Sequence, residues 1–168
     1  MRPPPAADAR THLTVDLVRA GRDWAPTVAE IRSWASAALG RRAAGAELAV
    51  HVVRPAESKR LNARYRGRNR PTNVLSFPVP DLPATAAGPQ VAPRPLGDLV
   101  ICARVVRDEA RRQHKTIKAH WAHLVIHGAL HLLGYDHERA AEARRMERRE
   151  VAVLKRFGIT NPYRSLGV

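Results

Sequence analysis

His120-Trp-Ala-His123-Leu-Val-Ile-His127-Gly-Ala-Leu-His131-Leu-Leu-Gly134-Tyr-Asp-His137 is the most informative stretch of this 168-residue chain. Apart from its histidines, the segment 117–133 is apolar on nearly every face, which predicts a helix buried in the core. At 100° per residue, the histidines from His120 to His131 fall within a sector of about 80° and form one polar stripe. Buried imidazoles need polar partners. For His120 and His123, a packed structural role and a role beside a bound ligand both stay open.

Three of these histidines have the spacing of a metal site. His127 and His131 stand one turn apart on the same helix face. Gly134 is the residue type that ends a helix in a left-handed cap, and the resulting reversal would carry His137 back toward the other two. Three neutral imidazoles with an open fourth position suit a catalytic zinc, whereas a structural zinc usually has four protein ligands. We therefore predict that His127, His131 and His137 bind one Zn²⁺ per chain, although three imidazoles also suit copper or nickel.

The residue after His127 argues against a metalloprotease. In the H-E-x-x-H zincins a glutamate follows the first histidine and acts as general base. In this chain that position is Gly128. Asp136 could supply the base instead, or it could only orient a neighbouring ligand, and the sequence leaves both roles open.

The composition is strongly basic. The chain has 29 lysines and arginines against 15 acidic residues, a net charge of +14, and a pI of about 11.4. A domain this basic usually binds polyanions, although a solvated arginine-rich surface would give the same numbers. The single cysteine, Cys102, excludes an internal disulfide and a zinc finger. Without an apolar run of about 18 residues or a signal-peptide pattern, a cytoplasmic protein without membrane contact is expected.

The rest of the pattern predicts one α+β domain at 11–160, between a disordered tail at 1–10 and a C-terminal tail at 161–168. A small mixed sheet of about four strands would pack against helices, one of which is a zincin-like metal-bearing helix. A flexible Pro/Ala-rich loop is expected at 80–95. Strands are predicted at 12–18, 47–53, 72–77 and 97–102, and helices at 26–38, 58–65 (with Ser58 as a possible cap), 103–115, 117–133 and 138–157.

The segment 59–70 concentrates positive charge around Tyr65. Guanidinium groups bind phosphates with two hydrogen bonds and stack on bases, so this segment predicts an RNA track. For any single residue, a solvated helix surface is the simpler interpretation. The basic side chains are Lys59, Arg60, Arg64, Arg66, Arg68 and Arg70.

Four blocks of the sequence resemble the YbeY-type endoribonucleases, a family of bacterial rRNA maturation factors. They run from about residue 60 to 137 in the family's order. The resemblance implies a zinc-binding α+β domain with His127, His131 and His137 as ligands and with Arg66 and His127 as catalytic residues. Asn73 stands where many members have aspartate. The blocks are Leu61-Asn62 with Tyr65-Arg66, Arg70-Pro-Thr-Asn73-Val-Leu-Ser-Phe77-Pro78, Leu96-Gly97-Asp98-Leu-Val-Ile101, and the histidine stretch 120–137.

The resemblance also implies a function: zinc-dependent, single-strand-specific endoribonuclease activity in late 16S rRNA 3′-end processing and ribosome quality control. Expected partners are precursor rRNA, the small ribosomal subunit and its assembly proteins, but not DNA. Zinc can polarise a phosphoryl oxygen or lower the pKa of a bound water toward about 7, and Arg66 would stabilise the developing negative charge. Whether water or the RNA 2′-hydroxyl attacks stays open. Because no general base is obvious, the alternative is a ribosome-assembly factor with a mainly structural zinc and no essential nuclease activity.

Overall fold

The computed structural model describes residues 12–79 and 93–164. The predicted tail at 1–10 and most of the predicted loop at 80–95 lie outside these residues. Within them, four strands form one mixed sheet in the order β1-β2-β4-β3. The strands β1 (Thr14–Arg19), β2 (Ala46–Val53) and β4 (Arg94–Cys102) are parallel, and β3 (Val74–Pro78) pairs antiparallel with β4 at one edge. The predicted α+β domain with a small mixed sheet is confirmed.

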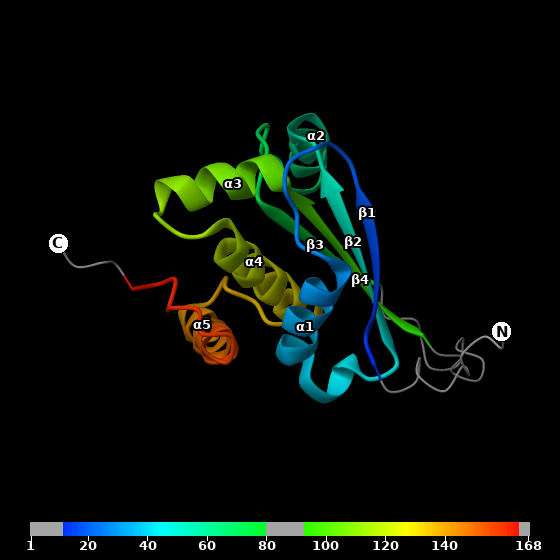
Figure 1. The fold of residues 1–168 in the computed structure, drawn as a ribbon, viewed down its shortest axis with the longest axis vertical. Coiled ribbons are helices and arrows are strands. Elements are labelled where there is room, and N and C mark those ends of the chain that lie inside the picture. The colour runs from blue at the N-terminus through cyan, green and yellow to red at the C-terminus, as the bar shows by residue number, and fades with distance from the viewer. Residues whose placement is uncertain (1–11, 80–92, 165–168) are drawn as a thin grey trace.

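One helix lies at the centre of the main helical layer. The helices are α1 (Val28–Leu39), α2 (Pro55–Arg66), α3 (Ala103–Arg112), α4 (Ile117–Leu132) and α5 (Ala140–Lys155), with a short 3₁₀ turn η2 at Gly40–Ala43. The helix α4 contacts α1, α3, α5 and the strands β3 and β4. Figure 1 shows α4 between the sheet and α5. None of the helices in the described part of the chain is long and apolar enough to span a membrane.

The predicted burial of α4 is confirmed. Thr116 caps its first turn by accepting a hydrogen bond from the Ala119 amide. Trp121, Val125 and Leu130 are completely buried in the core. A helix buried this fully is held by packing on all sides, so its histidines are fixed relative to the sheet.

Gly128 lets α4 rest directly on the sheet. A Cβ atom at this position would lie 2.8 Å from Leu99 Cδ2 and 3.3 Å from Ser76 Oγ. A glutamate would therefore collide with the sheet. Close packing, and not the metal chemistry, accounts for the glycine where zincins carry their general base.

The helix α2 lies on the opposite face of the sheet. In β2, Val50 and Val52 are buried in the main core, while His51 and Val53 alternate with them and line a cavity together with Leu61 of α2. Because successive strand residues point to opposite faces, α2 and α4 cover different sides of the sheet.

The predicted start of α2 at Ser58 is wrong. The helix begins at Pro55, a residue favoured in the first turn because it has no amide hydrogen to lose. Ser58 is buried, and its hydroxyl donates to the Thr72 carbonyl and accepts from the Thr72 amide, both at 2.9 Å. Asn62 likewise donates to the Arg70 carbonyl at 2.8 Å. These bonds tie α2 to the segment that leads into β3.

The predicted start of β4 is also wrong, because the strand begins at Arg94 inside the expected loop. The loop was expected up to Pro95 because the segment is rich in proline and alanine, and proline has no amide hydrogen for the ladder. Pro95 is tolerated because the pairing with β2 is shifted at Glu47 and Leu48, which forms a bulge. Two residues further on, Gly97 has φ +138°, and a Cβ there would lie 2.3 Å from the Phe77 carbonyl oxygen. This glycine allows β3 to pair closely with β4.

Candidate metal centre

The three histidines predicted to bind a metal lie together at the C-terminal end of α4. Their ring centroids are 4.6 Å apart for His127 and His131, 4.9 Å for His131 and His137, and 5.9 Å for His127 and His137. The Nε2 atoms of His127 and His131 are 3.0 Å apart. The rings therefore surround one small region, as the spacing in the sequence predicted.

The chain reversal that returns His137 is the predicted glycine cap. Gly134 has φ +94°. Its amide donates to the His131 carbonyl at 2.9 Å, and the Tyr135 amide donates to the Leu130 carbonyl at 3.1 Å. This pair of bonds is the Schellman arrangement, in which a left-handed residue satisfies the last carbonyls of a helix.

Asp136 shapes the loop that carries His137. Its Oδ1 accepts from the His137 amide at 2.6 Å and from the Glu138 amide at 3.3 Å. The same oxygen lies 3.6 Å from His137 Nδ1. Of the two roles left open for Asp136, the geometry favours orientation of the neighbouring histidine.

Hydrogen bonds on the far side of two rings determine which nitrogens face inward. His131 Nδ1 lies 2.8 Å from the Tyr135 carbonyl oxygen. A carbonyl only accepts, so this nitrogen carries the hydrogen. His127 Nδ1 similarly contacts a carboxylate oxygen of Glu150. In the neutral imidazoles both Nε2 atoms then present lone pairs to each other, an arrangement that a cation between them would stabilise.

A different group of side chains, which shares His127 with the three histidines, has the ligand-atom spacing of a metal site. Ligand atoms of His123, His127 and Glu150 all lie within 4.8 Å of one another. Glu150 is fully buried on α5. Its carboxylate contacts His127 Nδ1, lies 3.2 Å from His123 Nε2, and accepts a hydrogen bond from the Tyr163 hydroxyl.

The two groups differ in how many of their polar atoms already have hydrogen-bond partners within the protein. In the histidine–glutamate group, the carboxylate is the acceptor for three donors, so a metal there would have to replace those hydrogen bonds. In the three-histidine group, the inward Nε2 atoms of His127 and His131 contact each other and have no other hydrogen-bond partner among residues 12–79 and 93–164. The donor set with unused lone pairs is the better match to a Lewis acid.

The protonation states agree with this distinction. Burial favours the neutral form of Glu150, but hydrogen bonds from His123 and His127 outweigh it and lower the pKa of this carboxyl to about 2. Burial, together with the charge that a protonated His127 would carry, lowers the pKa of His131 to about 4. At neutral pH, Glu150 is an anion and His131 is a neutral imidazole ready to donate its lone pair.

Arg66 is the last residue of α2 and is exposed. Its positive charge is among the influences that lower the pKa of His131, after burial and the neighbouring histidines. The guanidinium is therefore close enough to the three-histidine group to act on it electrostatically. Of the other basic side chains in this segment, Arg60 is paired with Glu57 at 2.6 Å.

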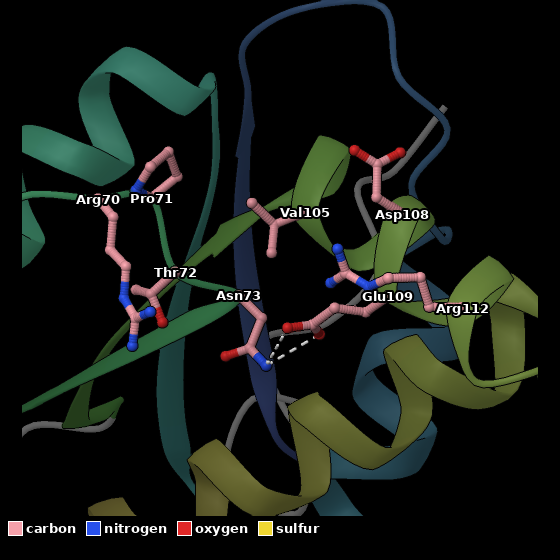
Figure 2. Close-up of a pocket in the computed structure, with 8 residues that line it drawn as sticks. All are labelled: Arg70, Pro71, Thr72, Asn73, Val105, Asp108, Glu109 and Arg112. Carbon is pink, nitrogen blue, oxygen red and sulfur yellow. Dashed lines mark hydrogen bonds between the residues drawn. The ribbon is translucent and has the colours of Figure 1, made fainter.

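His120, the first histidine of the stripe, belongs to a different network. Its Nε2 lies 2.7 Å from Glu109 Oε2, and Asn73 Nδ2 donates to the same oxygen at 3.0 Å. A cavity of about 390 Å³ lies beside Asn73 and Glu109. Arg70 and Arg112 are among the residues that line it (Figure 2). This network ties β3, α3 and α4 together, and it gives His120 a structural role away from the metal centre.

The amide of Asn73 fits this network better than an aspartate at this position would. Burial raises the pKa of Glu109, but hydrogen bonds from His120 and Asn73 outweigh it and keep the pKa below its usual value. In Asn73→Asp, a carboxylate would replace the amide 3.0 Å from Glu109. We expect a loss of about 1–3 kcal/mol in unfolding free energy at pH 7.

That loss should shrink as the pH falls from 7 toward 5. The two carboxyls would share a proton in the folded protein at a pH where the unfolded chain holds none, so acid favours the folded variant. Urea unfolding at several pH values measures this, with Asn73→Ala as the control that adds no charge. A deficit that did not change with pH would argue against contact between the two carboxyls.

Glu150 is the site residue that the sequence interpretation missed. A signal was present: Met146, Val153 and Leu154 are the buried apolar residues of α5, and Glu150 lies among them. An acidic side chain at an apolar helix position predicts a buried partner. Tyr163, which hydrogen-bonds Glu150, falls in the segment that was expected to be a tail.

Comparisons with known proteins identify a family and a fold to which this chain is similar. The family model described as endoribonuclease YbeY matches residues 21–158. An endoribonuclease YbeY from Alkalilimnicola ehrlichii is 54% identical over 155 residues, which cover 90% of each chain. The solution structure of TM1509 from Thermotoga maritima superposes with a TM-score of 0.56 over 91% of this chain and 97% of the other. At 22% identity, that likeness concerns the fold alone.

Proposed function

This chain belongs to the YbeY endoribonuclease family, and on that premise we propose that it cuts single-stranded RNA with the help of a bound zinc ion. Its substrate is precursor rRNA, its step is late maturation of the 16S rRNA 3′ end, and it contributes to ribosome quality control. It meets this substrate on the small ribosomal subunit and its assembly proteins. A net charge of +14 supports nonspecific attraction to such a polyanion.

His127, His131 and His137 hold the zinc in this proposal. The observation that carries it is the pair of inward lone pairs on His127 and His131, 3.0 Å apart, with the third imidazole beside them. When bound, the zinc supplies a Lewis acid that polarises a phosphoryl oxygen or activates an attacking group. Three protein ligands leave a position for the substrate, which a fully satisfied structural site would lack.

Arg66 acts on the phosphate. Its guanidinium belongs to an exposed helix end, and its charge contributes to lowering the pKa of His131, so in this proposal it donates two hydrogen bonds to an RNA phosphate at the metal. Because cleavage places extra negative charge on phosphorus, a fixed cation at this position stabilises the transition state more than the bound substrate. His127 contributes as a metal ligand, and Glu150 is already engaged by three donors.

Arg66→Ala tests this assignment. We expect cleavage of a single-stranded rRNA fragment to fall by about 10²–10³-fold, the usual cost of removing one charge-stabilising donor. Zinc content and thermal unfolding should stay unchanged, since Arg66 is exposed. Arg68→Ala is the matched control, an equally exposed arginine of the same segment, and it should cost much less. Cleavage is measured by gel electrophoresis of end-labelled RNA.

The same variant separates the two functions. If Arg66→Ala protein cuts RNA as well as the wild type does, the arginine is not catalytic, or the nuclease is a contaminant. If a non-cutting Arg66→Ala protein retains zinc and still supports 16S rRNA maturation in cells, the assembly-factor alternative is correct and the zinc is mainly structural.

A further inference from the structure

The side of the sheet away from the metal centre carries a second cavity. It has a volume of about 400 Å³ and lies between α2 and the strands β2, β3 and β4. Leu61 and Val100 contribute apolar walls, and Tyr65 and Phe77 contribute aromatic rings. None of these residues belongs to the metal centre or to the network around Glu109.

The two aromatic rings form a stacking surface. Tyr65 and Phe77 contact edge to face, with ring centroids 5.0 Å apart and an interplanar angle of 71°. Phe77 is half-buried and fixed by the sheet, while Tyr65 is 56% exposed. Such a pair presents a rigid aromatic face to solvent, which is the element that single-strand binding proteins use to stack bases.

The charges around the cavity suit different parts of a nucleotide in different places. Asp98 and Glu57 line the inside, each beside a basic partner: Asp98 is 3.3 Å from His51, and Glu57 is paired with Arg60. These carboxylates disfavour a phosphate within the cavity. Outside it, the Arg64 guanidinium lies 5.4 Å from the Tyr65 ring centroid and is exposed. The arrangement fits a base inside and phosphates on the arginine side.

The position of Tyr65 next to Arg66 connects this surface with the proposed cleavage site. Tyr65 directly precedes Arg66, the residue that contacts the RNA phosphate in the proposed function. The strand β3 is the edge of the sheet, so a chain of nucleotides can pass over this edge from one face to the other. A base stacked on Tyr65 would therefore belong to a nucleotide close to the phosphate at the metal.

We propose that the cavity between α2 and the sheet is a nucleobase subsite, in which one unpaired base of the RNA stacks on Tyr65 against Phe77. This inference rests on the proposed function, because the subsite would hold the same strand that is cut. It assigns to Tyr65 the positioning of the substrate, and it explains why a single strand, with its bases free to splay out, is the required form.

The test measures binding and is independent of cleavage. The zinc-loaded protein is titrated into a fluorescein-labelled 2′-O-methyl oligoribonucleotide of single-stranded rRNA sequence, with anisotropy as the readout and gels to verify that it stays intact. Abasic nucleotides then replace each position in turn. We expect one position to weaken wild-type binding about tenfold, the typical contribution of one stacked base.

Tyr65→Ala should weaken binding of the intact oligonucleotide by a similar factor and show no further loss at that abasic position. Tyr65→Phe retains the ring and should behave as the wild type does. Trp24→Ala is the matched control, because Trp24 is also an exposed aromatic residue (46%) but does not line the cavity. Its neighbour Asp23 pairs with Arg107 of α3. The Trp24→Ala variant should keep the full abasic effect.

Several outcomes would overturn the subsite. One is an abasic profile that is the same in Tyr65→Ala and wild type. This result would also be obtained if the surface bound a protein partner instead of RNA. Another is a Tyr65→Phe variant as weak as Tyr65→Ala, which would assign the effect to the hydroxyl. If the Tyr65-dependent position is found but no RNA is ever cut, the nuclease proposal fails and the subsite stands.

Discussion

His131→Ala is expected to abolish zinc binding and RNA cleavage together. His131 is the central member of the three-histidine group, with its ring centroid 4.6 Å from that of His127 and 4.9 Å from that of His137. Its removal leaves two imidazoles, too few to retain a catalytic zinc at ordinary concentrations. In protein purified without a histidine tag, the zinc content measured by elemental analysis should fall from about one zinc per chain to almost none.

A companion variant distinguishes the two possible metal groups. His123→Ala removes a member of the histidine–glutamate group on the same helix and leaves His127, His131 and His137 in place. We expect it to retain most of its zinc. The opposite pattern, with zinc lost in His123→Ala and kept in His131→Ala, would place the metal on Glu150 and refute the three-histidine assignment.

Most of the fold follows from local pattern. The helix α4 could be predicted because it is apolar on nearly every face apart from its histidines, and β2 because its apolar residues alternate, as Val50 and Val52 do. Boundaries were less predictable where tertiary contacts override local preference. Ser58 resembles a helix cap but uses its hydroxyl on Thr72, and Pro95 resembles a loop residue but fits beside a bulge.

The clustering of the three histidines was predictable because these residues are nearly contiguous in the sequence. A four-residue spacing on a helix and a turn at Gly134 bring His127, His131 and His137 together, and both features can be recognised in the sequence. The partner of His127 could not be predicted, because Glu150 belongs to α5 and contacts α4 only through tertiary packing. Burial of an acidic side chain signals that a partner exists but not which one. The same limit applies to Phe77, which meets Tyr65 only when α2 folds onto the sheet.

Glu150→Gln is expected to weaken zinc binding about 10–100-fold without abolishing it. Glu150 does not face the inward lone pairs. It acts through His127, whose Nδ1 hydrogen it accepts, so the carboxylate holds the ring in place and makes Nε2 a stronger donor. The amide can still accept that hydrogen bond but carries no charge, and its NH₂ group faces donors on His123 and Tyr163. Competition with a chromogenic zinc chelator gives the affinity, and Glu147→Gln, an exposed change of the same kind on α5, is the control.

The metal-free Glu150→Gln protein should also be less stable, by about 1.5–3 kcal/mol at pH 7, because hydrogen bonds to a buried charge are lost. An unfolded glutamate titrates near 4.5, and the folded Glu150 carboxyl has a pKa of about 2. The wild-type advantage is therefore complete above pH 4.5 and declines as the pH falls toward 2. Chemical unfolding across this range measures it. Zinc affinity equal to that of the wild type would refute the role of Glu150 in supporting His127, and complete loss of zinc would make Glu150 a ligand in its own right.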